Sequence, residues 1–79
     1  MKKTFIGKFV KNDELPSGPE YNFLTEEEIE IGKAYIFNEY GHPIYIIDIL
    51  AELKESISIN GKEIPLKTVT LRKEENGAN

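Results

Sequence analysis

The stretch that decides the fold runs from Pro43 to Leu50 and reads P-I-Y-I-I-D-I-L. Its isoleucines have branched Cβ atoms, which restrict rotamers in a helix but pack well on a pleated sheet. The whole chain shares this bias, with eleven isoleucines against three alanines. Because the stretch is apolar on both faces, we expect it to form a strand in the middle of a sheet.

Two further strands are expected on the N-terminal side of this stretch. Lys33 to Tyr40 alternates in the manner of a half-buried strand, and Gly41-His42 supplies a tight turn before Pro43. Thr4 to Lys11 is predicted to be the first strand. A glycine inside a strand marks a bulge or a close approach of another backbone, so Gly7 is expected to be one of these.

The C-terminal side predicts a hairpin. Leu50 to Glu55 is interpreted as the end of the central strand and a turn. Ser56 to Asn60 alternates cleanly, and Asn60-Gly61 is a strong signal for a type I′ turn. Glu63 to Leu71 is the return strand, but its apolar residues change parity near Lys67-Thr68. Either a bulge or a change of partner strand at that point would explain the change.

The remaining segments are expected to connect these strands. Asn12 to Glu20 has the composition of a loop, and Tyr21 to Leu24 is a short extended or turn segment. Thr25 to Glu28 matches a capping box, which predicts one helical turn at most. Residues 74–79 are polar and are predicted to be a disordered tail.

These elements define the expected architecture. Five short antiparallel strands in a chain of 79 residues bury their apolar faces best by curling into one small barrel. The fold class is therefore all-β, and residues 1–73 form a single domain followed by the tail at 74–79. A domain of this size has a small core and marginal stability.

The run Ile29-x-Ile31-Gly32-Lys33-Ala34-Tyr35-Ile36-Phe37 resembles the entry into the second strand of SH3-like barrels, including KOW-type domains. In that resemblance Tyr40-Gly41-His42-Pro43 is the turn, and Ile44 to Ile49 is the next strand. The resemblance implies a five-stranded SH3-like barrel and no catalytic residue. The chain is also similar to short barrel proteins of bacteriophages and mobile elements in Gram-positive bacteria, which implies a host protein as partner.

Composition narrows the chemistry. The chain has no cysteine, which removes thiolate catalysis and every metal site that needs cysteine. Its net charge of −4 opposes binding to a polyphosphate. Thr4 to Val10 is interrupted by Gly7 and Lys8, so no signal peptide is expected. No apolar run approaches the length of a membrane span. A cytoplasmic location is therefore predicted.

The titratable residues give no catalytic or metal-binding pattern. His42 is the single histidine, stands in a predicted turn and has no serine or cysteine near it in sequence. Asp48 sits among isoleucines, where a position at the barrel rim with a lysine or backbone partner fits better than catalysis. The acidic run Glu26 to Glu30 lacks the spacing of a calcium loop and fits a solvated turn. We expect no enzyme, no cofactor, no metal and no small-molecule substrate.

Binding is the remaining class of function. Tyr21, Tyr40 and Tyr45, with His42, are the candidate binding residues, because tyrosine is enriched at protein interfaces. The alternative is that these tyrosines only cover a small core and keep their hydroxyls in water.

The sequence predicts a protein-interaction module that uses a tyrosine-bearing face, an edge strand or the Asn12–Glu20 loop. Such a module would modulate or inhibit a host protein. One alternative is a KOW-like nucleic-acid binder, which would use the tyrosines together with Lys2, Lys3, Lys8 and Lys11. The other is a structural protein that associates with itself.

Overall fold

Strands alone build the part of the chain that the structure describes. The computed structural model describes residues 1–10, 15–16, 18–39 and 41–73. Its seven strands are β1 (Lys3–Phe9), β2 (Tyr21–Thr25), β3 (Ala34–Phe37), β4 (His42–Ile49), β5 (Ser56–Ile59), β6 (Lys62–Pro65) and β7 (Leu71–Lys73). No described residue is helical, so this part of the chain contains no helix capable of crossing a membrane. The prediction of an all-β fold is confirmed.

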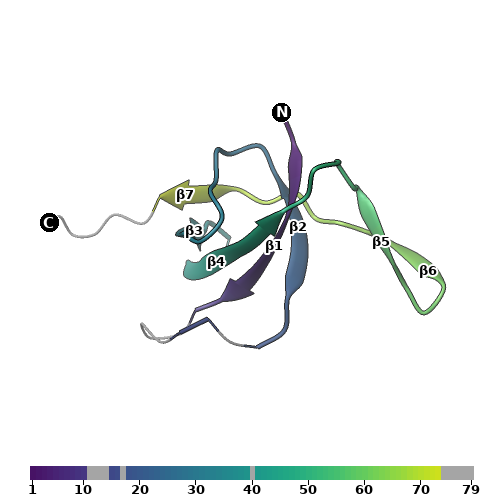
Figure 1. The fold of residues 1–79 in the computed structure, drawn as a ribbon, viewed down its shortest axis with the longest axis horizontal. Coiled ribbons are helices and arrows are strands. Elements are labelled where there is room, and N and C mark those ends of the chain that lie inside the picture. Colours follow the sequence, from purple (N-terminus) through teal and green to yellow (C-terminus); the bar gives the residue numbers. More distant parts are fainter. Residues whose placement is uncertain (11–14, 17, 40, 74–79) are drawn as a thin grey trace, which may run out of the picture.

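Five strands form one curled antiparallel sheet in the order β2-β1-β4-β3-β7 (Figure 1). The stretch predicted to be central is indeed the middle strand, β4. The segment that precedes β7 then bonds to β2, the edge strand at the other end of the sheet. The Leu24 N–H donates to the Lys67 carbonyl at 2.9 Å, and the Val69 N–H donates to the Leu24 carbonyl at 2.7 Å. The result is the small five-stranded SH3-like barrel that the sequence predicted.

Alternation along the strands assigns one face of the sheet to the core. Phe5, Phe37, Ile44 and Ile46 are completely buried on this face. The other buried members of the core are Ile29, Tyr35, Val69 and Leu71. Burial of each large apolar side chain stabilises the fold by about 1.5–3 kcal/mol, so this short list supplies much of the driving force. Residues between these positions point to the outer face.

Gly7 lies at an irregularity in the β1–β4 ladder. Ile6 is paired with Asp48 and Gly7 with Ile46, so β4 has one extra residue at this point. A Cβ atom on Gly7 would lie 2.8 Å from Cγ1 of Ile44 and 3.0 Å from the Tyr45 carbonyl oxygen. Both distances are too short for a side chain. Gly7 is therefore the site of a close approach, and the bulge beside it lies in β4.

The segment from Tyr21 to Glu28 contains a full strand, where the sequence predicted a short extended or turn segment and at most one helical turn. Residues Tyr21–Thr25 form a full strand that pairs with β1 along its whole length. Thr25 stays inside this strand and is completely buried. Its Oγ1 accepts a hydrogen bond of 3.3 Å from the Glu27 N–H. This side-chain bond makes a local turn, and no helical turn follows it.

The C-terminal strands also differ from the prediction in their partners. The segment Glu63 to Leu71 is divided into β6 and β7, and the chain changes partner near Lys67-Thr68. β5 and β6 form a separate two-stranded sheet, so Ser56 to Asn60 is not a barrel strand. β2 takes that place in the barrel. The sequence thus predicted the number of barrel strands correctly but not all of their members.

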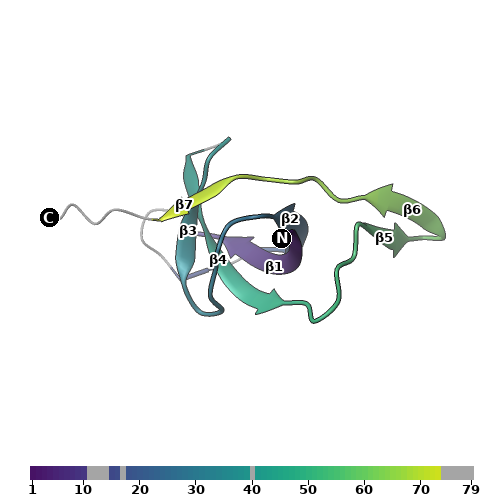
Figure 2. The same cartoon turned by 90° about the horizontal axis from the view of Figure 1, so that it is seen from above.

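The β5–β6 hairpin turns at Asn60-Gly61, as predicted. Both residues have positive φ angles, 52° at Asn60 and 78° at Gly61, which a type I′ turn requires. The register pairs Ile57 with Ile64 and Ile59 with Lys62. Both views show the hairpin projecting away from the barrel (Figures 1 and 2).

Candidate functional site

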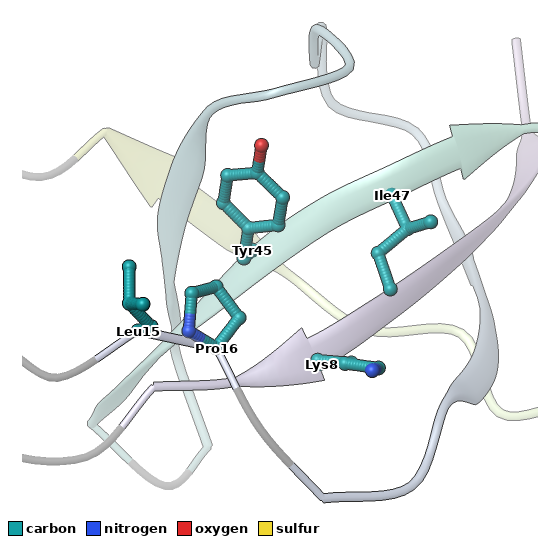
Figure 3. Close-up of a pocket in the computed structure, with 5 residues that line it drawn as sticks. All are labelled: Lys8, Leu15, Pro16, Tyr45 and Ile47. Atoms are coloured by element: carbon teal, nitrogen blue, oxygen red, sulfur yellow. The ribbon is translucent and has the colours of Figure 1, made fainter.

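A groove lies on the outer face of the sheet, opposite to the core. It has a volume of about 440 Å³ and is lined by Lys8, Leu15, Pro16, Tyr45 and Ile47 (Figure 3). Lys8 stands directly across from Tyr45 in the β1–β4 ladder. Three separate parts of the chain therefore contribute: β1, the connection that follows it, and β4.

The floor of the groove follows from the alternation of β4. Ile44 and Ile46 point into the core and are completely buried. Tyr45 and Ile47 consequently point to the opposite face, where each is only partly buried. Both side chains lie on the same side of the sheet as Lys8 (Figure 3).

Leu15 and Pro16 form an apolar wall beside this floor. They come from the connection between β1 and β2 and lie alongside the Tyr45 ring (Figure 3). Leu15 has 85% of its surface exposed, an unusual degree of exposure for a large aliphatic side chain. Pro16 is partly buried. A leucine that is held open to water at the rim of an apolar groove is available to contact a ligand.

The polar groups of the groove are few. Lys8 supplies its one charge, and within the described ranges its ammonium has neither an ion pair nor a hydrogen bond. The Tyr45 hydroxyl points away from Pro16 (Figure 3). It lies close to the Gly32 turn, since a Cβ atom on Gly32 would be 3.8 Å from it. The groove thus offers an apolar surface with one cation and one hydroxyl.

Of the candidate residues named by the sequence, those that the structure describes do not meet in one place. Tyr45 lines the groove. Tyr21 is paired with Gly7 and Tyr45 with Lys8, and neighbouring positions on β1 point to opposite faces, so these two tyrosines are on opposite faces of the sheet. His42 begins β4, is exposed and shares the parity of the core residues. Tyr40 lies outside the described residues.

Tyr21 belongs to an aromatic cluster on the core side. Its ring centroid lies 5.5 Å from that of Phe9 and 6.2 Å from that of Phe23. Phe37 contacts both phenylalanines, with centroid distances of 5.5 and 5.1 Å. Tyr21 remains 41% exposed. These contacts fit the alternative in which a tyrosine covers a small core, so Tyr21 has a structural reason for its position.

Ile47 was not among the predicted binding residues, and Leu15 and Pro16 were included only as part of the Asn12–Glu20 loop. Lys8 had been considered only as a phosphate contact of a nucleic-acid binder. Leu15-Pro16 carried a signal, because an apolar pair is unusual in a loop that is otherwise polar. Their meeting with Tyr45 depends on the register of β1 against β4, which the sequence does not contain.

The acidic residues are engaged in ordinary local contacts. Asp48 is exposed and accepts a hydrogen bond of 2.9 Å from the Ile49 N–H, in keeping with the backbone partner expected for it. In the acidic run, Glu30 lies 3.5 Å from the Lys33 ammonium. In the part of the chain that the structure describes, no three acidic or histidine side chains are grouped in a way that would hold a metal ion.

The fold and the groove define the class of protein: a small SH3-like β-barrel with an apolar groove on its outer face. Comparison with known proteins adds no closer relationship, since no family model, no curated protein and no solved structure matches the chain.

Proposed function

We propose that this barrel is a non-catalytic protein-interaction module that binds an extended segment of another protein in the outer groove. The observation that carries the proposal is the composition of the groove, which Tyr45, Ile47, Leu15 and Pro16 line together with Lys8. Tyrosine and exposed aliphatic groups bury area at low entropic cost when a protein partner binds. The groove has no pair of groups suited to acid–base or nucleophilic chemistry.

The positive charge of Lys8 indicates which residues the bound peptide segment should carry. Lys8 has no compensating carboxylate in the described residues, so a ligand with an acidic side chain would supply one. The apolar floor fits an aliphatic or aromatic side chain beside that acid. The occupant is therefore a peptide segment in which an apolar residue is flanked by Asp or Glu.

Nucleic acid is the competing occupant. A single lysine in the groove gives little attraction for a phosphate backbone, and the net charge of −4 acts against it. Lys3, another of the candidate phosphate contacts, already donates a hydrogen bond of 2.6 Å to the Glu27 carbonyl. These observations favour a protein partner over a nucleic acid.

The setting of the interaction forms part of the proposal. The resemblance to short barrel proteins of phages and mobile elements assigns the partner to the host, a Gram-positive bacterium. The lack of cysteine agrees with a cytoplasmic location, where thiols are kept reduced. In that setting the barrel acts as a modulator or inhibitor that occupies a surface of a host protein.

Selection from a random peptide library tests the site and its chemistry together. We expect the immobilised protein to enrich peptides that have an apolar residue next to Asp or Glu. Lys8→Glu should change the preferred flanking residue to Lys or Arg. Tyr45→Ser should reduce affinity for the enriched peptides at least about tenfold, as is usual for a central interface tyrosine.

Lys73→Glu is the matched control, because Lys73 is exposed on β7 and three strands away from β1. It has the same charge change as Lys8→Glu and should leave the selected peptides unchanged. Peptides without any acidic preference, or a preference that Lys8→Glu does not alter, would contradict the proposed site.

A further inference from the structure

The β5–β6 hairpin has one apolar face and one polar face. Its register places Ile57, Ile59 and Ile64 on the same side. Ile59 is 46% exposed and Ile64 is 41% exposed. On the other side, the Ser56 hydroxyl donates a hydrogen bond of 2.8 Å to Oε2 of Glu63. A polar face satisfied in this way suits water, whereas the isoleucine face leaves apolar surface uncovered.

The barrel does not cover this isoleucine face. β5 and β6 pack mainly against each other, and both views show the hairpin extending beyond the barrel (Figures 1 and 2). Neither strand is paired along its outer edge within the described residues. An isolated two-stranded hairpin is marginally stable in water and gains stability when its apolar face packs on another layer. A further layer on the isoleucine face would therefore stabilise the hairpin.

The charges on this face identify the second layer. The Leu66 N–H donates to the Glu55 carbonyl at 2.8 Å, which extends the ladder by one pair. Alternation then places Glu55 at the base of the isoleucine face, and Lys62 lies on the same face at the tip. Lys62 is paired with Ile59, which lies four residues along β5 from Glu55. The distance along the strand is about 13 Å, which is too far for an ion pair between Glu55 and Lys62 of one hairpin. No salt bridge involves either residue in the described part of the chain.

We propose that a second copy of this chain covers the isoleucine face, in an antiparallel arrangement related by a two-fold axis. Reversing one hairpin on the other brings Glu55 of each copy close to Lys62 of its partner copy. The same surface then serves both copies, as a two-fold interface requires. The isoleucines fill the centre, and the two ion pairs set the direction of packing. The barrels lie at opposite ends, which leaves both outer grooves open.

The size of the hairpin sets the strength of this dimer. Stable interfaces bury about 800 Å² on each partner, and a hairpin with four residues in each strand offers less. We therefore expect a dissociation constant on the order of 100 µM, in the range of weak and transient interfaces. A dimer of this kind forms when the local concentration is high, for instance when two copies bind neighbouring sites.

Sedimentation equilibrium between 10 µM and 1 mM tests the proposal by exchanging the charges. Lys62→Glu alone, or Glu55→Lys alone, places like charges together at both ends of the interface. Each should weaken the dimer roughly tenfold, since two exposed pairs are lost and repulsion replaces them. The double variant Lys62→Glu with Glu55→Lys restores opposite charges and should return the dissociation constant to within about threefold of the original.

Two controls keep the result specific. Ile64→Ser should abolish the dimer while circular dichroism shows an intact barrel. Tyr45→Ser, which changes the groove, should dimerise like the unaltered chain, so this inference and the proposed function can fail separately. A chain that stays monomeric at 1 mM, or a double variant no better than the single variants, would overturn the proposal.

Discussion

Thr4 connects the barrel to the base of the hairpin through one buried hydroxyl group. The side chain has no exposed surface. Its Oγ1 donates a hydrogen bond of 2.7 Å to the Lys54 carbonyl and accepts one of 2.8 Å from the Lys54 N–H. The Thr4 carbonyl accepts a further bond of 2.9 Å from the Leu50 N–H. This residue therefore satisfies the backbone of a segment that belongs to no strand.

Thr4→Val should lower the free energy of unfolding by about 1–3 kcal/mol, because two partly buried hydrogen bonds to Lys54, each worth about 0.5–1.5 kcal/mol, are lost. Thr4→Ser is the matched control, since it keeps the hydroxyl and removes one methyl group. It should cost clearly less than the valine variant, although valine has the closer shape. Urea unfolding followed by circular dichroism measures both, and equal losses would show that the hydroxyl is unimportant.

At the residue scale, sequence patterns predicted what each position does within its own strand. The parity of Tyr35 and Phe37, the close approach at Gly7 and the positive φ of Asn60 and Gly61 all follow from local patterns. The hydrogen bonds between Thr4 and Lys54 could not be predicted in this way, because fifty residues separate the two and no local pattern indicates the pairing.

At the scale of elements, the hairpin shows what a sequence pattern can and cannot predict. Its two strands and its turn were predicted, but its place outside the barrel was not. Alternation of Ile57 and Ile59 with serines is the same pattern that a half-buried barrel strand shows. Strand membership in a sheet depends on partners, and β2 took the expected place because its whole length pairs with β1.

Replacing residues 56–65 by Gly-Gly should leave the barrel folded. The hairpin contributes none of the buried core residues, and Leu66 already bonds to Glu55 across its base. The shorter connection also lowers the entropy cost of loop closure. We expect the Tm to change by less than about 4–8 °C, equivalent to about 1 kcal/mol for a domain of this size. Thermal unfolding measures the Tm, and a chain that no longer folds would show that the hairpin is part of the core structure.

At the scale of the whole molecule, the two faces of the barrel sheet carry different sets of residues. The inner face holds the core and the aromatic cluster that includes Tyr21, while the outer face carries Tyr45 in its groove. The sequence predicted the barrel and named Tyr45, but it placed Tyr45 in one set with Tyr21 and His42. Alternation along β4 separates His42 from Tyr45, and the pairing of β1 with β2 and with β4 separates Tyr21 from Tyr45.

The central claim is that a protein partner binds in the outer groove. Quantitative capture of proteins from a Gram-positive bacterial lysate tests this claim most directly. Three tagged proteins are compared with and without nuclease: the unaltered chain, the Tyr45→Ser variant and the Lys73→Glu variant. The proteins that each one retains are measured by mass spectrometry. We predict one dominant protein that survives nuclease, is retained equally by Lys73→Glu and falls at least about tenfold with Tyr45→Ser. Loss of all retained proteins after nuclease, with nucleic acid in the untreated eluate, would contradict the claim, and so would equal retention by Tyr45→Ser.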